Sequence, residues 1–123
     1  MQIRTCLYLS AMLLLATCRS SEVNHERLKL ADEIEQSART GLLDKWYPYS
    51  LDTIHGGFLS SFTFDFKPAE NQNKMIVSQS RHVWTTAKAA MAYPERDYYL
   101  KASAHGADFL WNVMRDNTSR GFY

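Results

Sequence analysis

Apolar residues recur every three or four positions in the first predicted helix, residues 24–46. This spacing is typical of a helix with one buried face. The apolar positions are Leu30, Ile34, Ala38 and Leu42. Acidic residues near the start of the segment suit the positive end of the helix dipole. Because a residue before proline is disfavoured in the α region, Pro48 is expected to end the helix with Tyr47 already extended.

Two further helices are predicted later in the chain. The second runs from Met75 or Ser78 to Tyr93, where Pro94 stops it. Its apolar residues lie on more than one face, so burial on several sides is expected: Ile76, Val77, Val83, Trp84, Ala87, Ala89, Ala90 and Met91. The third runs from Asp97 to Met114 and ends in the polar turn 115–120. Its predicted inner stripe is Ala102, Gly106, Phe109, Leu110 and Val113.

A different pattern separates the first helix from the second. Gly56 and Gly57 mark a turn, and Phe62, Phe64 and Phe66 then alternate with polar residues. This period of two predicts a short strand or one arm of a hairpin. The polar residues 67–74 that follow are predicted to form a loop.

The composition is that of an ordinary globular protein, with 46% apolar and 22% charged residues in a chain of 123. The net charge of +1 is spread along the chain without a basic stripe, so a nucleic-acid partner is not expected. Aromatic residues make up 13% of the chain, which suits a bulky core or a pocket that stacks on ring-shaped ligands such as sugars.

The N-terminus has the pattern of an export signal. Arg4 precedes an uncharged, mostly apolar stretch over residues 6–16 that is too short to span a bilayer. The sequence Leu15-Ala16-Thr17-Cys18 resembles a bacterial lipobox, although Thr17 departs from the usual small residue. We therefore expect a signal peptide over residues 1–17, a lipidated Cys18, a linker over 18–23 and an exported protein anchored to a membrane of the cell envelope. The alternative is an ordinary secretory signal that contains a cysteine.

The four histidines give no indication of a metal site. His25, His55, His82 and His105 lack the spacing of known ligand motifs, and no cofactor is expected. His82 should point about 100° around the helix from Arg81 and pack rather than act as a base. His105 and Asp108 lie three apart, which allows a local hydrogen bond.

Glycine and aromatic residues recur together at two places. Gly56-Gly57-Phe58-Leu59 and Arg120-Gly121-Phe122-Tyr123 each follow a helix and a polar turn. This indicates one repeat of a helical array and the start of the next. The alternative is a coincidence within a self-contained three-helix domain.

One face of the second helix carries the candidate binding residues. Val77, Arg81, Trp84 and Lys88 follow one another at helical spacing. From the residues alone, Arg81 is either a structural ion-pair or snorkelling residue, or a ligand contact. Trp84 is either a core residue or a platform for a sugar ring.

Together, several of these motifs resemble the N-terminal portion of the N-acylglucosamine 2-epimerase family, which includes cellobiose and mannobiose 2-epimerases. The resemblance rests on Trp46, Gly56-Gly57-Phe58, Lys74 and Gln79-Ser80-Arg81 with Trp84, in the family's order and spacing. It implies an all-α fold: residues 24–123 would form the N-terminal part of an (α/α)6 barrel, with a short β-hairpin or strand between the first two helices.

The resemblance also implies an activity. Family members act on the carbon next to a sugar's reducing carbonyl, through ring opening and a cis-enediolate. It assigns Arg81 to the carbonyl or enediolate oxygens and places Trp84 and Tyr123 near the substrate, with the acid and base histidines beyond Tyr123. The substrate would be a mono- or disaccharide. Two alternatives remain: an exported carbohydrate hydrolase or lyase on the same barrel, and a small non-catalytic binding module.

Overall fold

The computed structural model describes residues 23–123, which belong to two compact units divided between Gly41 and Leu42. The predicted signal peptide and Cys18 lie outside the described residues, as does nearly all of the linker. In the first unit, residues 23–36 form an α-helix that continues into the π-helix η1 (Ser37–Leu43). No described helix is long and apolar enough to cross a membrane.

The predicted buried face of the first helix is wrong for the described structure. Leu30, Ile34 and Leu42 are each more than half exposed, and Ala38 is exposed as well. An apolar stripe is buried only where another element covers it. The described part of the first unit, residues 23–41, contains no second element that could do so.

The second unit starts in the last two residues of η1 and continues with a short helix that passes through a proline. Helix α2 (Asp44–Tyr49) contains Pro48, so the predictions that Pro48 ends the helix and that Tyr47 is extended are both wrong. The proline is only one residue from the helix end, and the amide of Ser50, two residues later, donates to the Trp46 carbonyl at 2.7 Å. The helical turn therefore continues past the proline at the cost of one missing donor.

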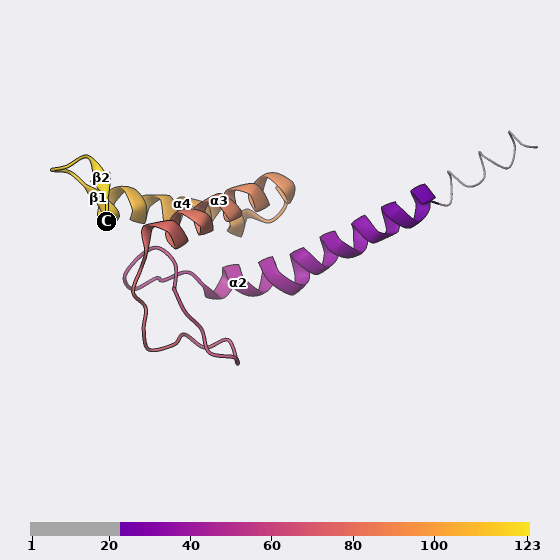
Figure 1. The fold of residues 1–123 in the computed structure, drawn as a ribbon, viewed down its shortest axis with the longest axis horizontal. Helices are drawn as coiled ribbons and strands as arrows, with labels where there is room; N and C mark the ends of the chain where they lie inside the picture. The colour runs from indigo at the N-terminus through magenta and orange to yellow at the C-terminus, as the bar shows by residue number, and fades with distance from the viewer. Residues whose placement is uncertain (1–22) are drawn as a thin grey trace, which may run out of the picture. The chain divides into compact units, whose positions relative to one another are not determined.

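Helices α3 (Ile76–Ala92) and α4 (Asp97–Phe109) pack side by side and are joined by a short turn (Figure 1). Their bounds agree with the prediction, and α4 extends into the π-helix η2 (Leu110–Met114). Ala102, Gly106 and Phe109 are buried as predicted, but Val113 is exposed and Met114 is buried instead. The wider π-turn adds a residue, which moves the inward position along by one.

Only one face of α3 is buried, contrary to the prediction of burial on several sides. Gln79, Thr86 and Ala89 are its buried residues, whereas Val77, Trp84 and Met91 are each at least half exposed. The neighbours of α3 in this unit cover one side of the helix and leave the side with these three apolar residues open.

The segment between α2 and α3 is an irregular loop rather than a strand. Two isolated antiparallel bridges, Leu51 with Phe58 and Phe62 with Pro68, give it the course of a hairpin. Phe66 has a φ of 61°, which interrupts the extended backbone that the alternation predicted. The strands described in this unit, β1 (Arg115–Asp116) and β2 (Gly121–Phe122), instead pair antiparallel, with β1 at the start of the predicted polar turn and β2 just after it.

Aromatic rings dominate the core of the second unit. Tyr47, Phe58 and Tyr99 are almost fully buried and pack with Ala89 and Ala102. Gly106 permits this packing, because a Cβ at that position would lie 2.3 Å from the Phe58 ring. Phe58 thereby anchors the loop against α3 and α4.

Candidate functional site

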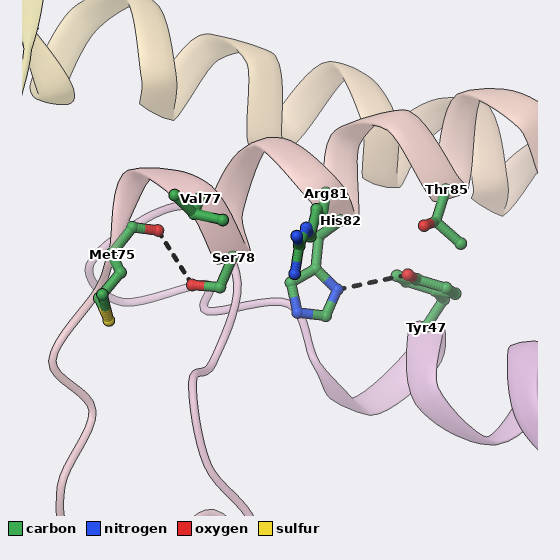
Figure 2. Close-up of a pocket in the computed structure, with 7 residues that line it drawn as sticks. All are labelled: Tyr47, Met75, Val77, Ser78, Arg81, His82 and Thr85. Atoms are coloured by element: carbon green, nitrogen blue, oxygen red, sulfur yellow. Dashed lines mark hydrogen bonds between the residues drawn. The ribbon is translucent and has the colours of Figure 1, made fainter.

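A hollow of about 330 Å³ lies where the N-terminal half of α3 faces α2 (Figure 2). Several hydroxyl groups and one cation line it. The lining residues are Tyr47, Met75, Val77, Ser78, Arg81, His82 and Thr85. Such a mixture of apolar walls and a few polar groups is typical of small-molecule sites.

Arg81 is the cation of this hollow, and its side chain is exposed. Among residues 23–123, no carboxylate lies within ion-pair distance of its guanidinium. The ion-pair interpretation of Arg81 therefore has no support in the described part of the chain. Its guanidinium donors remain open to a ligand that carries oxygen atoms.

His82 lines the same hollow, although the helical geometry predicted that it would point away from Arg81. Its ring stacks on Phe58 with centroids 4.7 Å apart, and its Nδ1 lies 3.3 Å from the Tyr47 hydroxyl. Burial lowers the pKa of His82 and raises the pKa of Tyr47, so both groups are neutral near pH 7. The prediction of a packed histidine is confirmed. That His82 lines the same hollow as Arg81 was not predicted.

The glutamine of the Gln79-Ser80-Arg81 motif has a structural role. Its side chain is 1% exposed and pairs with the main chain of Phe58, accepting from the amide at 2.8 Å and donating to the carbonyl at 2.9 Å. This pairing satisfies both backbone groups as a neighbouring strand would. It fixes the loop to α3 two residues before Arg81.

Lys74 and Asp52 form an ion pair beside the Gly56–Gly57 turn. The Lys74 ammonium lies 2.5 Å from the Asp52 carboxylate, also donates to the Gly56 carbonyl, and sits over the Phe109 ring. The other carboxylate oxygen of Asp52 accepts from the amides of Ile54 and His55. The lysine that marks the family resemblance therefore stabilises the turn rather than lining the hollow.

Asp52 and His105 belong to this network, and neither role was predicted. His105 Nε2 lies 2.9 Å from the Gly57 carbonyl and 3.2 Å from the Asp52 carbonyl, so it carries the proton and donates to them. The His105 ring therefore bonds to these two carbonyls and not to Asp108, the partner that the sequence spacing allowed. An aspartate a few residues before Gly56-Gly57 is a turn signal that could have indicated Asp52.

Trp84 and Tyr123, the other predicted substrate contacts, lie in different surroundings. Trp84 is 65% exposed and lines a second hollow of about 580 Å³ with Ser80, Arg81 and Thr85. Trp84 is therefore not a core residue within the described part of the chain. Tyr123 is 72% exposed and lines neither of the two hollows around Arg81. Its assignment as a substrate contact stays a prediction.

The Asp52 carboxylate makes stability depend on pH. Burial alone would raise its pKa, but the Lys74 hydrogen bond and two backbone amides lower the pKa from 3.8 to about 2. Because the folded-state pKa is the lower one, the stabilisation is present above about pH 4 and is lost as the pH falls toward 2. We expect the difference in unfolding free energy between the wild type and Asp52→Asn to shrink over this range in urea titrations. A difference that does not change with pH would contradict this assignment.

Within residues 23–123, no three His, Cys, Asp or Glu side chains come together as a metal site.

Comparisons with known proteins bear on the family and the fold of the chain. Residues 56–123, more than half of the chain, match the family model described as N-acylglucosamine 2-epimerase (GlcNAc 2-epimerase). No curated protein matches.

The fold is similar to that of a cellobiose 2-epimerase from Spirochaeta thermophila DSM 6192, with 32% identity and a TM-score of 0.69. The match covers 77% of this chain and 23% of the solved one. It confirms the predicted all-α fold class, part of an (α/α)6 barrel. On the family match, supported by the shared fold, the chain belongs to the N-acylglucosamine 2-epimerase family.

Proposed function

We propose that this chain forms the N-terminal portion of a sugar 2-epimerase in which Arg81 binds the reducing-end oxygens of the substrate. One observation carries the proposal: Arg81 opens into a hollow lined by Tyr47, Ser78 and Thr85 hydroxyls, with no carboxylate partner among the described residues. The family membership and the fold shared with a cellobiose 2-epimerase support a sugar as the ligand.

Arg81 would act through charge stabilisation. When the sugar ring is open, removal of the C2 proton moves negative charge onto the carbonyl oxygen and forms a cis-enediolate. A guanidinium offers donors in a fixed plane and stays cationic at any working pH, so it favours this charge over the neutral ground state. Return of the proton to the opposite face of C2 inverts that carbon.

Arg81 cannot carry the proton itself, because a guanidinium group is not deprotonated in proteins. In this proposal His82 is a wall of the hollow, since its ring is stacked on Phe58 and its Nδ1 is engaged with Tyr47. The acid and base are histidines expected beyond Tyr123. The proposed location is the cell envelope, with Cys18 as the site of lipid attachment.

Substitution of Arg81 tests the proposal in the complete gene product. We expect Arg81→Ala to lower kcat/KM for 2-epimerisation of cellobiose or glucose by about 10²-fold or more, because a transition-state donor is lost. Arg81→Lys should recover only part of the rate, since an ammonium does not reproduce the planar fork. NMR detection of the epimer would measure turnover.

Lys88 provides the matched control, because it is an exposed cation further along the same helix face. Lys88→Ala should leave turnover close to that of the wild type. Near-normal turnover by a folded Arg81→Ala variant would refute the role given to Arg81.

A further inference from the structure

One ring nitrogen of His82 is open to the hollow that contains Arg81. The side chain is half-buried and lines this hollow, and in Figure 2 it leaves α3 on the side that faces α2. Its Nδ1 lies 3.3 Å from the Tyr47 hydroxyl, whereas its Nε2 makes no hydrogen bond within residues 23–123. Nε2 is not among the buried polar atoms that lack a partner, so solvent reaches it. A ligand in the hollow could therefore bind to Nε2.

Aromatic neighbours hold the His82 ring in place. The Phe58 ring stacks on one face, with an angle of 22° between the two planes. The rings of Tyr47 and Trp46 lie 5.9 Å and 6.3 Å from the imidazole, measured between centroids. Because these contacts fix the side chain before a ligand arrives, a hydrogen bond from it would cost little conformational entropy.

The bond to Tyr47 determines which nitrogen of His82 carries the proton. Burial lowers the pKa of His82, so the ring is neutral near pH 7 and has a single N–H group. Burial raises the pKa of Tyr47, so the phenol keeps its proton. A phenol is a better donor than a neutral imidazole, and an unprotonated imidazole nitrogen is a better acceptor than a phenolic oxygen. Tyr47 therefore donates to Nδ1, which leaves the ring proton on Nε2.

A neutral N–H group beside a guanidinium suits two neighbouring oxygen atoms. A cis-enediolate carries its two oxygens, on C1 and C2, on the same side of the double bond. In the proposed function Arg81 binds the carbonyl oxygen on C1, which leaves the oxygen on C2 to a second donor. A neutral imidazole can donate to an enediolate and keep its proton throughout. It also adds no second positive charge beside Arg81.

We propose that the Nε2–H group of His82 binds the C2 oxygen of the substrate, and that Tyr47 orients this donor by fixing the tautomer. This inference rests on the proposed function, because it places the reducing end of a sugar at Arg81. His82 donates a hydrogen bond and transfers no proton. The substrate class follows from the donor: a hydroxyl group at C2 can accept this bond, whereas an acylamino group presents its own N–H there.

Nitrogen NMR of the complete gene product, labelled at histidine, tests the tautomer without reference to turnover. We expect the His82 proton on Nε2 in the wild type. Tyr47→Phe should give a mixture of tautomers, because the phenol that donates to Nδ1 is lost. A wild-type His82 with its proton on Nδ1 would overturn the proposal.

Two substitutions of His82 test the contact itself. The amide nitrogen of glutamine reaches close to the position of Nε2, whereas that of asparagine lies close to the position of Nδ1. Both variants lose the ring that stacks on Phe58, so a difference between them reports on the donor. We expect kcat/KM for epimerisation of glucose or cellobiose to be about tenfold lower in His82→Asn than in His82→Gln. Equal rates in the two variants would show that only packing matters.

Ligand selectivity provides a readout that a purely structural role would not change. By isothermal calorimetry, the wild type should bind glucose about tenfold more tightly than 2-deoxyglucose, which lacks the C2 oxygen. It should also prefer glucose to N-acetylglucosamine. Both preferences should shrink in His82→Asn. A preference that does not change in this variant, or a wild type that favours N-acetylglucosamine, would refute the contact.

The outcomes separate this contact from the proposed function. If Arg81→Ala abolishes most turnover but the two His82 variants are equal, the His82 contact is refuted and the function at Arg81 stands. If the wild type neither binds nor epimerises glucose or cellobiose, the proposed function fails and the His82 contact fails with it.

Discussion

Gly57→Ala is expected to destabilise the second unit by about 3 kcal/mol or more. Gly57 has a φ of 69°, a left-handed conformation that is costly for alanine. The added Cβ would also lie 2.6 Å from both the Gln79 Oε1 and the Phe109 ring. Gln79 cannot move away without breaking its two bonds to Phe58, which would leave buried polar groups unpaired. Urea unfolding followed by circular dichroism would measure the loss.

Gly121→Ala is the matched control for this prediction. The second Gly-aromatic pair follows a similar turn, but a Cβ at Gly121 would meet nothing within 4 Å and the residue does not have a positive φ. We therefore expect an unfolding midpoint close to that of the wild type. Similar losses for both variants would show that the crowding at Gly57 is not the cause.

Helices α3 and α4 could be predicted because their signals are local. Pro94 and the apolar spacing define the ends of α3 and α4 without reference to any neighbour. The loop could not be predicted in the same way. Alternation of Phe62, Phe64 and Phe66 predicts a strand only if a partner strand and a covering layer are present, and here Phe66 turns into a left-handed conformation instead.

The candidate site, too, could be predicted from the sequence only in part. Helical spacing placed Arg81 and Trp84 on one face, but spacing does not reveal whether that face is covered, so the exposure of Trp84 had to come from the structure. The structural roles of Lys74 and Gln79 could not be predicted from the sequence either. Both were recognised from the family motif, yet their partners Asp52 and Phe58 lie about 20 residues earlier and are joined to them only by tertiary folding.

Loss of the Lys74 cation is the second change with a large expected effect. Lys74→Met keeps most of the side-chain volume but leaves the Asp52 carboxylate, which is 5% exposed, without its ion-pair partner. It also removes the donor to the Gly56 carbonyl. Breaking a buried pair from one side costs about 3 kcal/mol or more, because the remaining charge stays out of water. We expect a loss near 3 kcal/mol in urea unfolding, since Asp52 still accepts two backbone amides.

Two comparisons decide whether burial is the reason. The pair between Lys101 and Asp97 has the same 2.5 Å separation, but its side chains are 73% and 74% exposed. Lys101→Met should therefore leave the unfolding midpoint almost unchanged, because exposed pairs contribute little.

Combining Lys74→Met with Asp52→Asn removes the unpaired buried charge, so the double variant should be more stable than Lys74→Met alone. If the two methionine variants lose equal stability, or if Asp52→Asn gives no recovery, the turn does not depend on a buried ion pair. Recovery in the double variant would show that Lys74 stabilises the Gly56–Gly57 turn by neutralising Asp52. This turn then fixes the loop against α3, the helix that carries Arg81.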